Sequence, residues 1–456
     1  MGLNLPPPYV MKKLILLLLS MLPGVHCASA ATVYFDVNGD TTGSGVTSTT
    51  YSWAAATALW STNAAGASAT AGWVSGDSAI FSAGSDAVGQ AYILNSSAPH
   101  NVPSIRVKDG SVQLMGSATT NTGITIDSGQ TFAVSTALGL VVPATNSICL
   151  INGGTMANAN GGVGSSFFSS GSANGNMDIV LGTGGGTLAV FGPSTATISI
   201  YTGLISGTGP LTIGGAGTFR LTTRTNIYTG DTFVTGRLQV STTANVLPQS
   251  TALTLNSPGE LNLQALLTVA SLSGDGPITS TGAGNLTITG TNSTTYNGIM
   301  QNGGSLTVNK SGGTGTLTLA GANTFTGVLT LTAGTLTVDP SGALCGQVCD
   351  LAVNGGILNL NNTAQTVEDF GGTSGTVNLA SGHTLSLSAV NASATRSRNY
   401  AGVIAGAGNI ATTTANAGTV LTETLSGANT YNGSTTVNQG TLTLAGGAAL
   451  INTSSM

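Results

Sequence analysis

The stretch Thr316–Val338 reads T-L-T-L-A-G-A-N-T-F-T-G-V-L-T-L-T-A-G-T-L-T-V, and degraded copies of it recur along most of the chain. Leucine and valine alternate with threonine in it, a period of two that places aliphatic side chains on one face of a β-strand and hydroxyls on the other. A unit of this size cannot bury its own apolar face, so neighbouring units must stack. The stretch therefore predicts an all-β solenoid with turns of about 20 to 25 residues.

The copies align on their corner residues. Four of them share an aromatic residue followed two positions later by glycine: Tyr228 and Gly230, Tyr296 and Gly298, Phe325 and Gly327, and Tyr431 and Gly433. A second glycine then opens a strand, at Gly236, Gly304, Gly334 and Gly440. Glycine suits corners that need positive φ or a close backbone approach, and asparagine is the next best residue there.

Composition narrows the class of protein. The 456 residues include 67 glycines, 41% are hydrophobic and only 5% are charged. Ordinary globular domains carry about 25% charged residues, and disordered chains combine high charge with low hydrophobicity. Because glycine, threonine, serine and asparagine dominate, helix is disfavoured after the first thirty residues. We expect a thin aliphatic core that runs along a rod.

The N-terminus has the layout of a secretory signal. Lys12 and Lys13 precede the apolar run Leu14–Leu19, and Ala28–Ala30 supplies small residues for cleavage. We expect residues 1–30 to be removed, with Met11 as an alternative start; a lipid anchor at Cys27 is disfavoured. The mature net charge of 8 − 15 = −7 disfavours nucleic acid as a partner. No transmembrane segment is expected in the mature chain.

Export to an oxidising compartment would allow the cysteines to form disulfides. Cys345 and Cys349 lie four residues apart, and in an oxidising compartment this pair predicts a structural disulfide that fixes one corner of the stack. A metal site or a redox-active pair is the alternative interpretation, although further ligands are not close in sequence. Cys149 stands alone and is expected to be a buried small hydrophobe.

Residues 31–100 differ from the rest and are expected to form an N-terminal cap. They hold all three tryptophans, Trp53, Trp60 and Trp73, and a solenoid needs such an atypical unit to cover its first open turn. The run from Asp36 through Asn38 to Asp40 has oxygen ligands at alternate positions, which makes calcium a possible ligand. A turn stabilised by its Asx side chains is favoured over calcium, because the glycine falls at the wrong position for a calcium loop.

The repeat resembles the autotransporter-associated β-strand repeat found in passenger regions of secreted and surface-exposed bacterial proteins. The opening from Tyr34 to Phe81 is similar to the leader segment that often precedes such repeats. The resemblance implies a right-handed parallel β-helix over residues 101–456, carried through or held at the outer membrane, with no catalytic residue or cofactor in the repeat itself. Such proteins end in a membrane barrel or an anchoring tail. Because the sequence to Met456 contains neither, we expect a truncated chain whose translocator or anchor is missing.

An enzyme would need convergent carboxylates, since parallel β-helices also host polysaccharide lyases and hydrolases. The acids and histidines of the mature chain are scattered, and Glu368 and Asp369 form the only adjacent acidic pair. Neighbours on a strand point to opposite faces, so a solvated turn is the expected setting for this pair, and an exposed turn for His383. The other scattered groups are Glu260, Glu423 and His100.

The remaining motifs have structural interpretations. The glycine runs Gly182–Gly186 and Gly312–Gly315 are expected to be turns, because strand patterns follow them where a phosphate-binding loop would need a helix. Two small arginine groups are expected to be solvated edges, with a sugar-acid or partner-binding patch as the alternative. They comprise Arg220, Arg224 and Arg237, and Arg396 with Arg398.

The sequence thus favours a non-enzymatic exported or surface-displayed passenger that serves adhesion or scaffolding. Cell-surface glycans, extracellular matrix and other surface proteins are the candidate partners. The alternative is a polysaccharide-degrading β-helix whose catalytic groups come from loops between repeats.

Overall fold

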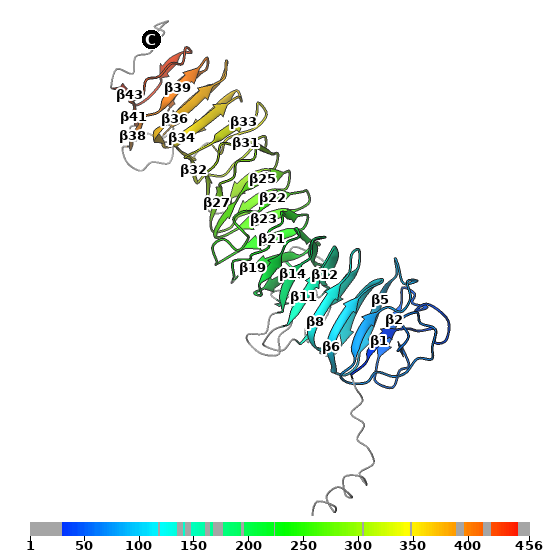
Figure 1. Ribbon diagram of the computed structural model, residues 1–456. Helices are drawn as coiled ribbons and strands as arrows, with labels where there is room; N and C mark the ends of the chain where they lie inside the picture. Colours follow the sequence, from blue (N-terminus) through cyan, green and yellow to red (C-terminus); the bar gives the residue numbers. More distant parts are fainter. Residues whose placement is uncertain are drawn as a thin grey trace, which may run out of the picture.

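The computed structural model describes residues 30–445, apart from residues 117–118, 135–139, 142–146, 160–164, 167–176, 193–195, 223, 303–304, 347–348, 389–395 and 414–420. Across these ranges the regular secondary structure is entirely β. The strands wind into a parallel β-solenoid of about 14 turns, which advances from one end of a rod to the other in sequence order (Figure 1). The expected all-β solenoid is confirmed. Residues 1–29 and Gly304 lie outside the described residues.

Each turn places strands on up to three faces of the rod, numbered here in the order in which the chain meets them. Face 1 consists of β1 (Thr32–Phe35), β4 (Ser78–Phe81), β6 (His100–Val107), β8 (Thr119–Ile126), β11 (Ile148–Ile151), β14 (Asp178–Leu181), β17 (Ile205–Gly207), β24 (Leu266–Val269), β27 (Ala283–Ile288), β30 (Ser305–Lys310), β32 (Val328–Leu331), β38 (Arg396–Tyr400), β41 (Leu421–Leu425) and β43 (Thr441–Leu444). Two short strands pair at its margins, β3 (Trp60–Ser61) with β1 and β10 (Leu140–Val141) with β8.

Face 2 runs almost the whole length of the rod. It consists of β2 (Thr50–Trp53), β5 (Ala91–Ser96), β7 (Ser111–Gly116), β9 (Thr131–Val134), β12 (Gly154–Asn158), β15 (Gly186–Val190), β18 (Leu211–Gly214), β20 (Thr232–Val234), β22 (Ala252–Leu255), β25 (Ser271–Gly274), β28 (Thr294–Tyr296), β31 (Thr316–Leu319), β33 (Thr335–Val338) and β39 (Val403–Gly406). The long strands β34 (Asp350–Leu360) and β36 (Phe370–Leu379) bend across from face 1 to face 2.

Face 3 is the most interrupted. It consists of β13 (Ser165–Ser166), β16 (Ile198–Tyr201), β19 (Thr218–Leu221), β21 (Arg237–Val240), β23 (Glu260–Leu263), β26 (Ile278–Ser280) and β29 (Met300–Asn302), followed toward the C-terminus by β35 (Ala364–Val367), β37 (Thr384–Ser388), β40 (Asn409–Thr413) and β42 (Thr435–Val437). Among the described strands, every pairing except that of β1 with β3 is parallel.

The length of chain in a turn is less uniform than the repeat predicts. Thr316 lies beside Thr335 in the next turn, a step slightly shorter than expected. The step from Leu261 to Ile278 is shorter still, whereas the step from Gly154 to Gly186 is nearly twice as long. The ladder is therefore held by strand pairing, and the corners absorb the differences in length.

The period of two decides what is inside. In β31 and β33 the leucines and Val338 are buried while the threonines are partly exposed, as predicted. One continuous apolar cluster runs through the interior of the rod. The anchor aromatics belong to it: Tyr228, Tyr296, Phe325 and Tyr431 are each at most 2% exposed. The hydroxyls of Tyr228 and Tyr431 bond threonine hydroxyls four residues on, at 2.6 Å.

In the repeats that contain Gly334 and Gly440, the two glycines meet different demands. Gly334 and Gly440 have φ values of +73° and +84°, a conformation that L side chains rarely adopt. The anchor glycines have no positive φ and are required by close approach. A β-carbon on Gly327, for example, would collide with the carbonyl oxygen of Leu306 in the preceding turn.

The repeat asparagines connect three turns. Asn323 is 2% exposed; its Oδ1 accepts the amide of Met300 in the preceding turn at 2.8 Å, and its Nδ2 donates to the carbonyl of Ala343 in the next turn at 2.7 Å. Asn226 makes the equivalent two bonds in its own repeat. The expectation that asparagine replaces glycine at positive φ is wrong at these positions, because their side chains act as hydrogen-bonding links between turns.

The first turns enclose an aromatic cluster, at the blue end of the rod in Figure 1. Trp60 lies 5.2 Å from Trp53 and 4.9 Å from Trp73 between ring centroids, and Phe35 and Phe81 pack beside it. All three tryptophans are at most 5% exposed. This aromatic cluster fills the interior where the aliphatic repeats have not yet begun.

Within the described part of the chain, no helix could cross a bilayer.

Candidate functional site: a polar groove on face 3

A straight row of polar side chains crosses five turns of face 3. Strand register places Arg220 beside Gln239, Gln239 beside Asn262, Asn262 beside Thr279 and Thr279 beside Gln301. Because side chains alternate along a strand, their neighbours in sequence point into the apolar core and this row points outward. In β31 and β33, by contrast, each outer position is threonine.

The side chains of the row bond to one another. Gln239 donates from Nε2 to Oδ1 of Asn262 at 3.0 Å, and Asn262 donates from Nδ2 to Oγ1 of Thr279 at 3.0 Å. Arg220 donates from Nε to Oε1 of Gln239, and Gln264 adds a second donor to Asn262 at 3.0 Å. As a result, Gln239 and Asn262 are only 8% and 1% exposed although they point outward.

An ion pair lies beside the row. Arg237 Nη2 is 3.3 Å from Glu260 Oε1, and Thr279 donates to the same carboxylate oxygen at 2.6 Å. The Nε of Arg237 is buried and has no hydrogen-bond partner among the described residues. The prediction of solvated edges is wrong for Arg220 and Arg237, since both are partly buried and hydrogen-bonded or paired. Arg224 is exposed, and the side chain of Arg396 lies outside the described residues.

These groups form a recess of about 360 Å³, called the polar groove below. Its lining consists of Arg237, Glu260, Asn262, Thr279, Ser280, Thr281, Gln301 and Thr324. The lining offers amide, hydroxyl, guanidinium and carboxylate groups held in fixed positions. Among these described residues Glu260 is the single acid and none is a histidine, whereas acid–base hydrolysis needs a second positioned group. The groove can therefore donate and accept hydrogen bonds, but its lining lacks the pair for glycosidic cleavage.

A second recess, on face 2, is apolar. It has a volume of about 290 Å³ and is lined by residues of β5, β7 and β9 and by Phe191. Phe191 is 50% exposed and lies near the row Ala133, Ala157 and Ala189. This recess has few polar groups to orient a ligand.

The acidic pair near the C-terminal turns is not in a solvated turn. Glu368 and Asp369 are 4% and 7% exposed, so that prediction is wrong, because long-range stacking decides burial here. Arg398 donates from Nη2 to Oδ2 of Asp369 at 2.5 Å. Glu423 is fully buried nearby, and burial, followed by the charge of Asp369, raises its pKa to about 8. These groups do not line either recess described above.

His383 is also inside, which contradicts the expected exposed turn. It is 0% exposed and its Nδ1 donates to the carbonyl of Asn362 at 2.6 Å. Burial lowers the pKa of His383, so the neutral ring is favoured. His100 stacks on Trp53 with 4.8 Å between ring centroids and bonds its carbonyl through Nε2 at 2.9 Å. Both histidines are therefore buried side chains that hydrogen-bond backbone carbonyls of the solenoid.

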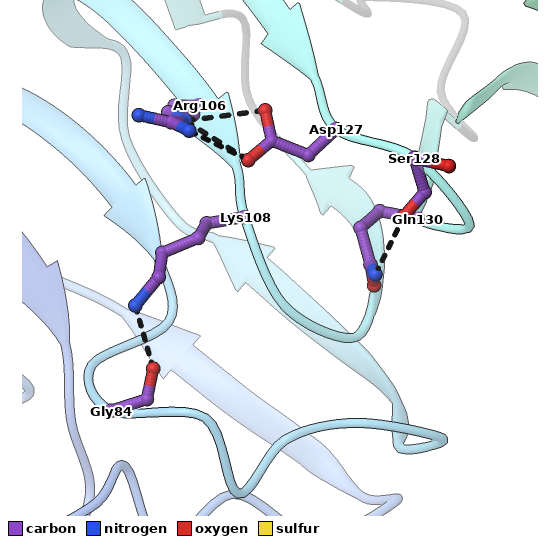
Figure 2. Close-up of polar contacts among 6 residues, drawn as sticks. All are labelled: Gly84, Arg106, Lys108, Asp127, Ser128 and Gln130. Atoms are coloured by element: carbon purple, nitrogen blue, oxygen red, sulfur yellow. Dashed lines mark hydrogen bonds and ion pairs between the residues drawn. The ribbon is translucent and has the colours of Figure 1, made fainter. Parts of the chain in front are cut away.

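A surface ion pair on face 1 offers a comparison with the groove (Figure 2). Arg106 binds Asp127 with Nε 3.2 Å from both carboxylate oxygens and Nη2 2.8 Å from Oδ2. The two side chains are 52% and 27% exposed, against 26% and 22% for Arg237 and Glu260. Lys108 in the same view donates to the carbonyl of Gly84. The Arg106–Asp127 pair is thus an equivalent pair outside the polar groove.

The other candidate residues are placed as follows. Cys345 and Cys349 are joined in a disulfide, with 6.1 Å between their Cα atoms. Cys149 is buried as expected, and burial raises the pKa of its thiol. Both glycine runs are followed at once by strands, β15 and β31, which confirms the expected turns.

The loop after β1 has the hydrogen bonds of an Asx turn. Asp36 Oδ1 accepts the amides of Asn38 and Gly39 at 3.0 and 3.2 Å. Burial, with Asp86 and Asp40 as smaller contributors, raises the pKa of Asp36. The described residues contain no group of three or more acidic, histidine or cysteine side chains that could hold a metal. The loop therefore has the Asx turn that the sequence favours, and calcium stays the untested alternative.

Three segments of the solenoid match a known repeat family. Residues 211–240, 312–338 and 422–444 match the passenger-associated-transport-repeat. Each segment includes one of the corners with a linking asparagine, an aromatic and a glycine. The chain is a repeat protein of the autotransporter-passenger type. The resemblance inferred from the sequence is confirmed.

One curated relative supports the same assignment. Over 371 residues, 74% of this chain, the passenger-type chain is 30% identical to "Adhesin BmaC autotransporter" of Brucella suis biovar 1 (strain 1330). The alignment covers 9% of the length of that relative, so the chain spans only a small part of the protein that it matches. No solved structure matches the chain.

Proposed function

We propose that the chain is a non-enzymatic passenger, displayed at or released from the cell surface, whose β-solenoid serves adhesion or acts as a structural scaffold. The observation that carries this proposal is the match of most of the chain to a protein named as an autotransporter adhesin, together with the passenger repeats. The same comparison supports export to the surface or the outer membrane. The rod supplies a long surface with few charges and many hydroxyls and amides.

The alternative is a polysaccharide-degrading enzyme, and one observation favours it. Glu423 and Asp369 lie close enough for the charge of Asp369 to act on Glu423, and the pKa of Glu423 is raised to about 8. A buried carboxyl with a raised pKa beside a second carboxyl resembles the general acid of a glycosidase. However, Glu423 is 0% exposed, so a polysaccharide could reach it only if the coil opened. The adhesive function therefore has the better support.

The test is adhesion without turnover. The exported chain is applied to surfaces coated with host-cell glycans, matrix proteins or whole cells, and retention is measured beside the release of reducing ends from soluble polysaccharides. We expect retention on at least one surface and no new reducing ends. Depolymerisation that disappears in Glu423→Gln would overturn the proposal in favour of the enzyme.

A further inference from the structure

We propose that the polar groove on face 3 binds an uncharged, hydroxyl-rich saccharide chain that lies along the axis of the rod. This inference rests on the proposed adhesive function, and it names the ligand class and the residues involved. The relevant properties of the groove lining are its spacing, its charge and its rigidity.

The spacing fits an extended sugar chain. Asn262, Thr279 and Gln301 occupy matching positions on three consecutive turns. Successive turns of a parallel ladder lie about 4.8 Å apart, close to the length of one hexose unit in an extended chain. A saccharide aligned with the rod would therefore meet the accessible side chains of Glu260, Thr279 and Gln301 on three successive turns, while the buried Asn262 holds Thr279 in place from beneath.

The charge fits a neutral ligand. The only ionisable side chains among the described lining residues are Arg237 and Glu260, which pair at 3.3 Å. A phosphate, sulfate or uronate would be repelled by the Glu260 carboxylate, and a cationic ligand by Arg237. A neutral hydroxyl can accept from the guanidinium and donate to the carboxylate without disturbing the pair. The buried Nε of Arg237 is a donor that has no partner in the described part of the chain.

The rigidity lowers the cost of binding. Thr279 is held on both sides, since its Oγ1 accepts from Asn262 and donates to Glu260. Asn262 is 1% exposed and is itself fixed by Gln239 and Gln264. Groups already held in place lose little conformational entropy when a ligand arrives. None of the described lining residues is aromatic, so the stacking that strengthens many sugar sites is missing from them. We therefore expect weak binding at one groove and strong retention only where many copies meet a polymer.

The first experiment measures binding of the exported chain to immobilised polymers. The uncharged probes are dextran, mannan and xyloglucan, and the charged probes are polygalacturonate and heparin. We expect retention on at least one uncharged polymer and none on the charged ones. Retention confined to polyanions, or on no polymer, would overturn the proposal.

Two groove variants then locate the site. The double variant Thr281→Val with Gln301→Leu removes polar groups from the groove without touching the core, and we expect retention to fall by roughly tenfold, equivalent to about 1.4 kcal/mol. Glu260→Gln leaves Arg237 without a counter-charge, and we expect it to gain retention on polygalacturonate. Unchanged retention in both variants, at unchanged melting temperature, would overturn the proposal.

The matched control is Asp127→Asn, which breaks the equivalent Arg106 pair on face 1. We expect this variant to bind all five polymers as the unaltered chain does; the same gain as Glu260→Gln would show a nonspecific charge effect and overturn the assignment to the groove. The two proposals also fail separately. If adhesion to cells survives in every groove variant, the saccharide site in the polar groove is overturned and the adhesive function is not. If the chain binds polymers but adheres to no surface, the proposed adhesive function is overturned and the saccharide site is not.

Discussion

Single side chains connect the turns of this solenoid more than the repeat pattern suggests. Asn323 adds side-chain hydrogen bonds at a corner, where it accepts from the buried amide of Met300 and donates to the partly buried carbonyl of Ala343. Buried backbone groups without partners cost about 1–3 kcal/mol each. An asparagine at such a corner therefore contributes to the stacking of three successive turns.

We expect Asn323→Ala to lower the free energy of unfolding by about 1–3 kcal/mol, because the buried amide of Met300 and the partly buried carbonyl of Ala343 lose their side-chain partner. Denaturant titration followed by circular dichroism measures the change. Asn309→Ala is the control, since Asn309 bonds Asn285 at 3.2 Å in a partly buried outer ladder, and we expect it to cost less than about 1 kcal/mol. Equal costs for the two variants would show that Asn323 is not a link between turns.

Glu423 is expected to make stability depend on pH. Its pKa in the folded chain is about 8 and the ordinary value is 4.5, so the folded state holds the proton more tightly. The resulting stability is fully present below about pH 4.5 and is lost as pH rises through about 8. The loss is on the order of 5 kcal/mol. Arg398 and Asp369 are the charged groups that act on it.

We expect Glu423→Gln, which stays neutral, to be more stable than the unaltered chain at about pH 9 and nearly equal to it at about pH 5. Comparing the two chains at each pH cancels the other titrating groups. His383 acts in the opposite range, because its lowered pKa gives stability that is lost as pH falls. Parallel stability curves for the two chains between these pH values would contradict the role assigned to Glu423.

At the scale of elements, the period of two predicts where the strands lie, but it does not predict which residues of successive turns lie side by side. The alternation in Thr316–Val338 predicts β31, β32 and β33 and their buried leucines. It does not reveal that Gln239, Asn262 and Thr279, far apart in sequence, share one row, because the turns differ in length. The sequence analysis therefore missed the polar groove, although the unusual amides at outer strand positions were a signal.

The burial of single charged or titratable groups also could not be predicted from the sequence. His383 and Asp369 occur in short polar segments that look like exposed turns. Their burial depends on which strands stack above and below, as between β35 and β37 or between β36 and β38. Local pattern identifies the strand faces, whereas the register between distant turns decides which corner is covered.

The aromatic cluster of the first turns is expected to stabilise that end of the rod as a unit. Trp60 is 3% exposed and packs among Trp53, Trp73, Phe35 and Phe81. We expect Trp60→Ala to cost about 3–5 kcal/mol and to reduce the near-ultraviolet dichroism of the chain. The control is Val74→Ala in the same region, at a side chain that is 49% exposed; an equal loss there would contradict a packing role for Trp60.

At the scale of the whole molecule, the stability of a solenoid is close to a sum over its turns and their interfaces. Thr316 and Thr335 hold equivalent positions in adjacent turns, so deleting residues 316–334 removes one complete turn in register. We expect the shortened chain to fold, with a melting temperature within about 5 °C of the original and a rod shorter by about 4.8 Å in solution scattering.

The contrasting deletion removes residues 316–325, about half a turn. It joins strands that belong to different faces, so the aliphatic side chains of β32 and β33 lose their neighbours. We expect this variant to be cleaved by protease near the junction. Equal stability of the two deletions would argue against stacking in register as the source of stability.

The uneven size of the coils has a mechanical consequence. The hydrogen bonds between coils run along the axis, so a tether pulling on the two ends of the rod would load the coils one after another. Each detached coil would release a length set by its share of the chain, for example about 60 Å for the step between Leu261 and Ile278 and about 110 Å for the step between Gly154 and Gly186. A passenger built in this way would lengthen in unequal increments under shear, and would dissipate force while its remaining coils kept their shape.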